Sequence, residues 1–114
     1  MHEWSLAIEI VKIAEKELKE RNAKKVEEVF LEIGSLNNIV VEQLIDAFEI
    51  AKKGTLLDDA KLYVEEIEAV AFCNKCNKRS EIEPPFIFCP LCMGNDVKIE
   101  KGEELHLKKL TLEF

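Results

Sequence analysis

Two pairs of cysteines are the residues of this chain best suited to chemistry. Each pair has two residues between its members and twelve residues separate the pairs, which consist of Cys73, Cys76, Cys89 and Cys92. A two-residue gap lets one tight turn direct both sulfurs at the same ion, and two such turns complete the tetrahedral thiolate shell that Zn²⁺ favours. Because this closed shell leaves no position for water, we expect a structural site. The same shell also suits a single iron ion, as in a rubredoxin-like electron carrier.

A second candidate site lies at the start of the chain, at Met1, His2 and Glu3. A free α-amine, the deprotonated amide of residue 2 and the imidazole of residue 2 can surround one ion with three nitrogens, a donor set that favours Ni²⁺ or Cu²⁺. We expect Met1 to supply the amine, and Glu3 to add its amide or a nearby carboxylate. The residues alone leave a second interpretation, a solvated tail in which His2 has no function.

Composition and charge exclude several classes of function. The 114 residues carry a net charge of −7, so neither nucleic acid nor an anionic membrane is an expected partner. No apolar run approaches the ~20 residues of a membrane helix, and the start of the chain resembles neither a secretory signal nor a transit peptide. We therefore expect a cytoplasmic protein, whose cysteines bind metal instead of forming disulfides.

The remaining residues give no sign of an enzyme. The chain has no Ser/His/Asp set, no open zinc site and no phosphate-binding loop. His106 is the only histidine besides His2, and it lies on a lysine-rich segment near the C-terminus. We expect it to be an exposed strand residue that does not bind metal.

Apolar residues recur at helical spacing in two segments. The first, residues 5–21, has a hydrophobic stripe on one face and Glu and Lys on the other, as an amphipathic helix does. The second, residues 39–53, follows Asn37-Asn38, which we expect to cap it. It ends after two lysines at Gly54, a residue type typical of the position after a helix.

Apolar and β-branched residues predict extended segments at residues 28–33, 62–72 and 105–114. The apolar phase slips at Glu65-Glu66, which indicates a bulge, and again at Lys108-Lys109. We expect the last strand to return to the first sheet. The predicted fold is therefore α+β, with two helices on a small, mainly antiparallel sheet that the C-terminal strand completes, and with an inserted four-cysteine zinc-ribbon module.

This order of elements predicts two domains. Residues 1–68 together with residues 102–114 form a nickel-binding α/β domain, and residues 69–101 form a zinc-binding domain. The second segment is too short to bury an adequate core of its own, so we expect the metal to hold it together.

Taken together, these residues resemble the HypA family, the nickel metallochaperones of [NiFe]-hydrogenase maturation. The resemblance spans nearly the whole chain and rests, besides the paired cysteine motifs, on the segments Met1-His2-Glu3-Trp4-Ser5, Leu31-Glu32-Ile33-Gly34, Ala47-Phe48-Glu49, Gly54-Thr55 and Gly102-Glu103-Glu104-Leu105. It implies a non-enzymatic carrier that binds Ni²⁺ weakly near its N-terminus. His2 would be the essential ligand, Glu3 would serve nickel binding or delivery, and the four cysteines would hold structural Zn²⁺.

The resemblance also implies partners. They are a HypB-type GTPase and the precursor of the [NiFe]-hydrogenase large subunit, with urease maturation a further role in some organisms. We expect a monomer or a weak homodimer. The alternative from another class is a zinc-ribbon adaptor that binds proteins without delivering nickel.

Two positions depart from the pattern of the family. Met93 directly follows Cys92, where the family more often has glycine, and this would alter the turn but leave the ligands intact. At the start of the second helix some members recruit an acidic side chain, where this chain has Asn38-Ile39-Val40-Val41. An outer carboxylate ligand from that segment is therefore not expected.

Overall fold

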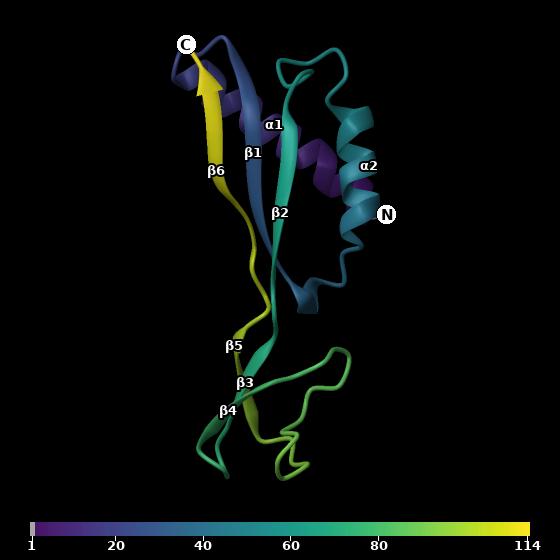
Figure 1. The fold of residues 1–114 in the computed structure, drawn as a ribbon, viewed down its shortest axis with the longest axis vertical. Helices are drawn as coiled ribbons and strands as arrows, with labels where there is room; N and C mark the ends of the chain where they lie inside the picture. Colours follow the sequence, from purple (N-terminus) through teal and green to yellow (C-terminus); the bar gives the residue numbers. More distant parts are fainter. Residues whose placement is uncertain (1) are drawn as a thin grey trace. The chain divides into compact units, whose positions relative to one another are not determined.

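The computed structural model describes residues 2–114, without the side chain of His2. Its elements in chain order are α1 (His2–Glu20), β1 (Lys25–Gly34), the 3₁₀ helix η1 (Ser35–Asn37), α2 (Val41–Ala51), β2 (Lys61–Ile67), β3 (Val70–Cys73), β4 (Lys78–Glu81), β5 (Val97–Lys101) and β6 (Leu105–Glu113). The strands form one sheet in the order β2-β1-β6 and another in the order β4-β3-β5 (Figure 1). This arrangement confirms the predicted α+β fold. In the described part of the chain, neither helix is long and apolar enough to cross a membrane.

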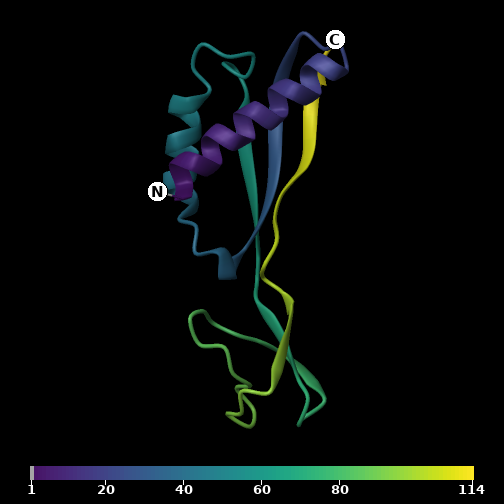
Figure 2. The same cartoon turned by 180° about the vertical axis from the view of Figure 1, so that it is seen from behind.

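The first of two compact units contains the chain up to Leu31, Ile39–Glu65 and Leu107–Phe114. In this unit α1 runs across one face of the strands and packs against α2, as Figures 1 and 2 show from opposite sides. The buried stripe of α1 has the expected helical spacing and consists of Ala7, Ile10, Val11, Ala14 and Leu18. It shares the core with Val26, Val29 and Leu31 of β1 and with Leu44 and Phe48 of α2.

Both helices begin differently from the prediction. α1 begins at His2, three residues before the expected Ser5. α2 begins at Val41 after the N-cap residue Val40, which makes no side-chain capping bond, so the predicted cap at Asn37-Asn38 is wrong. The backbone N–H of Val40 donates instead to the carboxylate of Glu3 at 3.1 Å. One hydrogen bond therefore connects the first turn of α1 with the start of α2.

Asn37 has another role than the predicted one. Its side-chain amide donates to the carbonyl oxygens of Gly34 at 3.2 Å and of Glu104 at 2.6 Å. Asn38 adopts a left-handed conformation with φ 56°, which ends η1. The two asparagines thus fix the turn after β1, and the capping prediction failed because the amide of Asn37 is engaged with backbone distant in sequence.

The extended segment 62–72 forms two strands of different sheets. The prediction of a single strand was wrong, because β2 ends at Ile67 and β3 begins at Val70. The bulge at Glu65-Glu66 stays a prediction. The last strand was predicted correctly. β6 lies beside β1 and runs antiparallel to it, since Gly34 N–H donates to the Glu104 carbonyl and Lys24 N–H to the Glu113 carbonyl, both at 2.7 Å.

The second compact unit contains Glu32–Asn38 and Glu66–His106. Its buried core is small and consists of Ala69, Ala71 and Ile82, against which Leu36, Val97 and Ile99 pack. The division that we predicted, residues 1–68 plus 102–114 and residues 69–101, stays a prediction. In the structure, residues 32–38 belong to the same compact unit as the cysteine-bearing segment. Leu36 packs against the core of this unit, and its N–H donates to the Gly102 carbonyl at 2.9 Å.

Two glycines allow the backbone of this unit to approach itself closely. A Cβ on Gly34 would overlap the carbonyl group of Gly102. A Cβ on Gly102 would lie 2.7 Å from the Cα of Ala69, and the φ of Gly102 is +114°. Ala69 lies in the break between β2 and β3, so the close approach of Gly102 occurs where the extended segment divides.

We expect Gly34→Ala to lower the free energy of unfolding by about 3 kcal/mol, because backbone atoms of Gly102 cannot move aside as a side chain can. Gly54→Ala is the matched control, since its φ is +75° but its added Cβ would meet open space. That variant should lose only about 1 kcal/mol. Urea denaturation of both variants measures the difference, and equal losses would contradict the close approach.

Candidate metal centre

The four cysteines come together in the second compact unit. Cys73 ends β3, Cys76 lies in the turn that follows, and Cys89 and Cys92 lie in the loop before β5. All four sulfurs lie within 4.8 Å of one another, and the sulfur of Cys73 is 3.7 Å from that of Cys92. A zinc–sulfur bond of ~2.3 Å implies about 3.8 Å between sulfurs of a tetrahedron. The arrangement therefore fits one four-coordinate zinc ion.

The two turns have the same backbone geometry. In the first, Asn77 N–H donates to the Cys73 carbonyl at 2.8 Å, and Asn77 is left-handed with φ 54°. In the second, Met93 N–H donates to the Cys89 carbonyl at 2.8 Å, and Met93 is left-handed with φ 62°. The residue after each second cysteine thus adopts a conformation that glycine adopts without strain. The expectation that Met93 alters the turn was therefore wrong, because Met93 adopts this conformation too, at a cost of about 1–2 kcal/mol.

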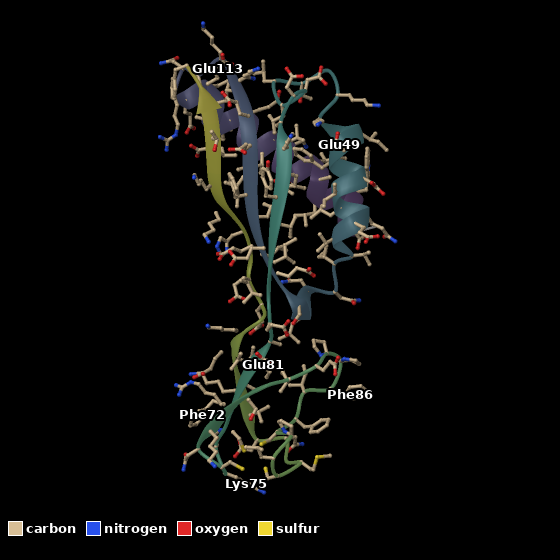
Figure 3. All side chains as sticks on the ribbon, viewed as in Figure 1. Glu49, Phe72, Lys75, Glu81, Phe86 and Glu113 are labelled. Carbon is tan, nitrogen blue, oxygen red and sulfur yellow. The ribbon has the colours of Figure 1, made fainter. Side chains whose placement is uncertain are left out.

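Neighbouring strands hold the first turn in place. Cys73 pairs with Lys78 of β4 and with Val97 of β5. The next residue, Asn74, donates its backbone N–H to the Asp96 carbonyl at 3.0 Å and its side-chain amide to the Asp96 carboxylate at 2.9 Å. Figure 3 shows sulfur atoms gathered near Lys75, which lies in this turn.

The thiols of the cluster do not ionise alike. Backbone N–H groups, that of Cys92 first and that of Leu91 next, lower the pKa of Cys89 to about 7. Hydrogen bonding with Cys92, followed by desolvation, raises the pKa of Cys76 to about 12. Four thiolates so close together need a cation, and its binding must displace the proton of Cys76. Metal affinity therefore falls as the pH falls.

The structure describes only part of the predicted nickel site. Met1 and the side chain of His2 lie outside the described residues, whereas Glu3 is half-buried in the first turn of α1. Its carboxylate lies beside the start of α2, where it accepts the hydrogen bond from Val40. The nickel ligands Met1, His2 and Glu3 stay a prediction.

His106 lies on β6, and its side chain is exposed as expected. Its Nε2 is 2.7 Å from a carboxylate oxygen of Glu32, on the neighbouring strand β1. Within the described residues, the groups that could hold a metal include the four cysteines and do not include His106.

Sequence reasoning missed the residues that support the cysteine turns. The bonds between Asn74 and Asp96 join residues 22 apart, and their spacing carries no signal. Asn77 could have been found, because asparagine after a C-x-x-C pair tolerates the left-handed conformation that the turn requires. Met93 gives no such signal, since methionine does not favour a positive φ.

Comparison with known proteins points to one family over the whole chain. The family model described as "Hydrogenase/urease nickel incorporation, metallochaperone, hypA" matches residues 1–112. Hydrogenase maturation factor HypA 2 of Bradyrhizobium diazoefficiens is 35% identical over 99% of this chain and 100% of its own length. Hydrogenase maturation factor HypA of Chlorobium limicola is 36% identical over 99% of this chain and 97% of its own length.

Solved structures share the fold. The solution structure of the Ni metallochaperone HypA from Helicobacter pylori superposes with a TM-score of 0.68 at 24% identity and covers 97% of both chains. A second solution structure, titled HypA protein, gives a TM-score of 0.71 at 24% identity and covers 98% of this chain and 96% of that one.

These findings confirm the resemblance and the predicted pair of metals, structural Zn²⁺ for the four-thiol centre and transported Ni²⁺ for the family. A metallochaperone is a carrier by its description and belongs to the hydrogenase maturation machinery. Because the family model covers residues 1–112 and relatives above 30% identity align over 99% of the chain, this protein belongs to the HypA family of hydrogenase and urease nickel-incorporation metallochaperones.

Proposed function

We propose that this protein is a nickel metallochaperone that binds Ni²⁺ at its N-terminus and delivers it to the large subunit of a [NiFe]-hydrogenase during maturation. The observation that carries this proposal is the match of residues 1–112, which contain both the Met1-His2-Glu3 start and the paired cysteines, to one nickel-incorporation family. Met1, His2 and Glu3 bind the nickel, and Cys73, Cys76, Cys89 and Cys92 bind the zinc.

The two sites are suited to opposite tasks. The four thiols converge on one point, so an ion there contacts only sulfur and is retained as part of the fold. A site at the chain terminus uses nitrogen donors from one short segment, and an incoming ligand from another protein can replace them one at a time. Weak binding at the N-terminus is therefore a requirement of delivery.

The proposed partners supply what this chain lacks. The sequence contains no G-x-x-x-x-G-K-[ST] loop, so a nucleotide-dependent step belongs to another protein, a HypB-type GTPase. The recipient is the precursor of the hydrogenase large subunit. The protein acts as a carrier in the cytoplasm, as a monomer or weak homodimer, and catalyses no reaction of its own.

We expect Cys76→Ser to release the zinc and to unfold residues 73–101, while α1 and α2 stay folded. The small core of the second unit cannot order this segment without metal, whereas the helices are buried against β1. Metal analysis gives the zinc content, and amide chemical shifts show which segment loses its order. Lys75→Ser is the control, because Lys75 is exposed and lies between Cys73 and Cys76 without being a ligand. An ordered segment 73–101 in zinc-free protein would contradict the structural role.

We expect nickel binding to require the amine of Met1 and the ring of His2. His2→Ala removes the imidazole, and one extra residue before Met1 removes the amine from the chelate, so each should reduce bound Ni²⁺ from one ion per chain to nearly none. Equilibrium dialysis of zinc-loaded protein measures this, with His106→Ala as the control that loses a histidine elsewhere. Stoichiometric nickel in the extended protein would refute the amine chelate.

We expect acid to release nickel before zinc. An imidazole with an ordinary pKa of ~6.5 and an amine of ~7.8 must both be deprotonated to bind, so protons displace Ni²⁺ as the pH falls from about 7.5 to 6. Thiolates bound to zinc are kept deprotonated by the ion and accept protons only at lower pH. Metal analysis after dialysis across this range tests the order, and simultaneous loss of both metals would show that the sites are not independent.

A further inference from the structure

A groove of about 550 Å³ lies beside the proposed nickel site, within the first compact unit. It runs between the first turn of α1 and the outer side of α2, and its lining residues are Glu3, Trp4, Ser5, Gln43, Asp46, Ala47 and Ile50. The contributions of α2 have the spacing of one helix face, three and four residues apart. The groove is thus a continuous seam between two packed helices.

Large apolar side chains are exposed in this seam. Trp4 is 39% exposed and Ile50 is 59% exposed, whereas Leu44 and Phe48 of α2 are fully buried. Val40, also exposed, precedes α2 beside Glu3. Apolar surface that gathers around a groove and is bordered by polar residues is typical of a site where another protein binds.

Two of the described residues that line the groove, Glu3 and Asp46, are charged, and both are acidic. Nearby on α2, the charge of Glu49 is balanced by Lys52 at 2.8 Å, whereas Asp46 makes no ion pair with any described residue. A partner segment with basic residues beside apolar ones would complement both features of the groove.

We propose that this groove binds a basic amphipathic helix of a partner protein. A helix placed along a seam between two helices presents apolar anchors one turn apart to Trp4 and Ile50, while lysines or arginines at its edge meet Asp46. The proposal rests on nickel delivery, because a partner bound beside Glu3 stands next to the proposed nickel ligands. A second copy of this chain is a disfavoured partner, because each copy has a net charge of −7 and the acidic groove residues of the two copies would repel each other.

The test uses two amphipathic helical peptides of about 20 residues. One consists of leucine and lysine, and the other has glutamate at every lysine position. Trp4 is the only tryptophan of the chain, so its fluorescence reports the groove directly. We expect the lysine peptide to shift the Trp4 emission to shorter wavelength and the glutamate peptide to have no effect. Amide chemical shifts should change in the first two turns of α1 and along residues 43–50 of α2.

Matched variants separate the groove from general charge attraction. Asp46→Lys should weaken binding of the lysine peptide by about tenfold. Ile50→Ser, which leaves the charge unchanged, should weaken it by about threefold. Asp58→Lys makes the same charge reversal at an exposed position outside the groove, and its effect should stay below about twofold. Circular dichroism verifies that each variant is folded.

Four results would overturn the proposal. The first three are equal weakening by Asp46→Lys and Asp58→Lys, equal binding of the two peptides, and no response of Trp4 to the lysine peptide. The fourth is a Trp4 shift that appears on concentrating the protein alone, which would assign the groove to a second copy. Nickel dialysis on the same variants is independent of these results. Wild-type protein that binds no nickel would refute the proposed function, whereas nickel binding without a peptide response in Trp4 would refute the groove alone.

Discussion

Four thiol sulfurs within 4.8 Å of one another are the constraint on which the second compact unit depends. Thiolates at this separation repel each other, and the thiols differ in how readily they ionise, since hydrogen bonding with Cys92 raises the pKa of Cys76 whereas backbone N–H groups lower that of Cys89. A divalent ion stabilises all four sulfurs as thiolates, because its positive charge offsets part of their negative charge. The backbone N–H groups of the second turn, which already favour the thiolate of Cys89, add to the same effect.

The rest of this unit is built with little apolar burial. Its core holds two alanines and Ile82, with Leu36, Val97 and Ile99 packed around them. Small residues are required there, since the backbone of Gly102 approaches both Gly34 and Ala69 too closely for a side chain. Close approach of backbones gives well-defined geometry but buries few methyl groups. The unit therefore gains its stability from metal–sulfur bonds and from hydrogen bonds such as those of Asn37.

Features that depend on neighbouring residues could be predicted from the sequence. The two-residue spacing within each cysteine pair determines a turn, and the stripe from Ala7 to Leu18 determines a helix. Features that depend on distant residues could not be predicted. Asn37 binds the carbonyl of Glu104, 67 residues away, instead of capping α2. The break between β2 and β3 lies where the backbone of Gly102 comes close to Ala69, and no local pattern at Glu68-Ala69 indicates this break.

The proposed N-terminal nickel site lies next to a contact between residues that are likewise distant in sequence. The hydrogen bond from Val40 to Glu3 joins residues 37 apart, and it fixes the first turn of α1 where a free terminus would fray. For the proposed nickel chelate, an ordered first turn limits the conformations from which the chelate forms and so lowers the entropy lost on binding. In the proposed function the nickel ligands come from one short segment, so another protein can replace them one at a time, while the hydrogen bond from Val40 keeps Glu3 in place.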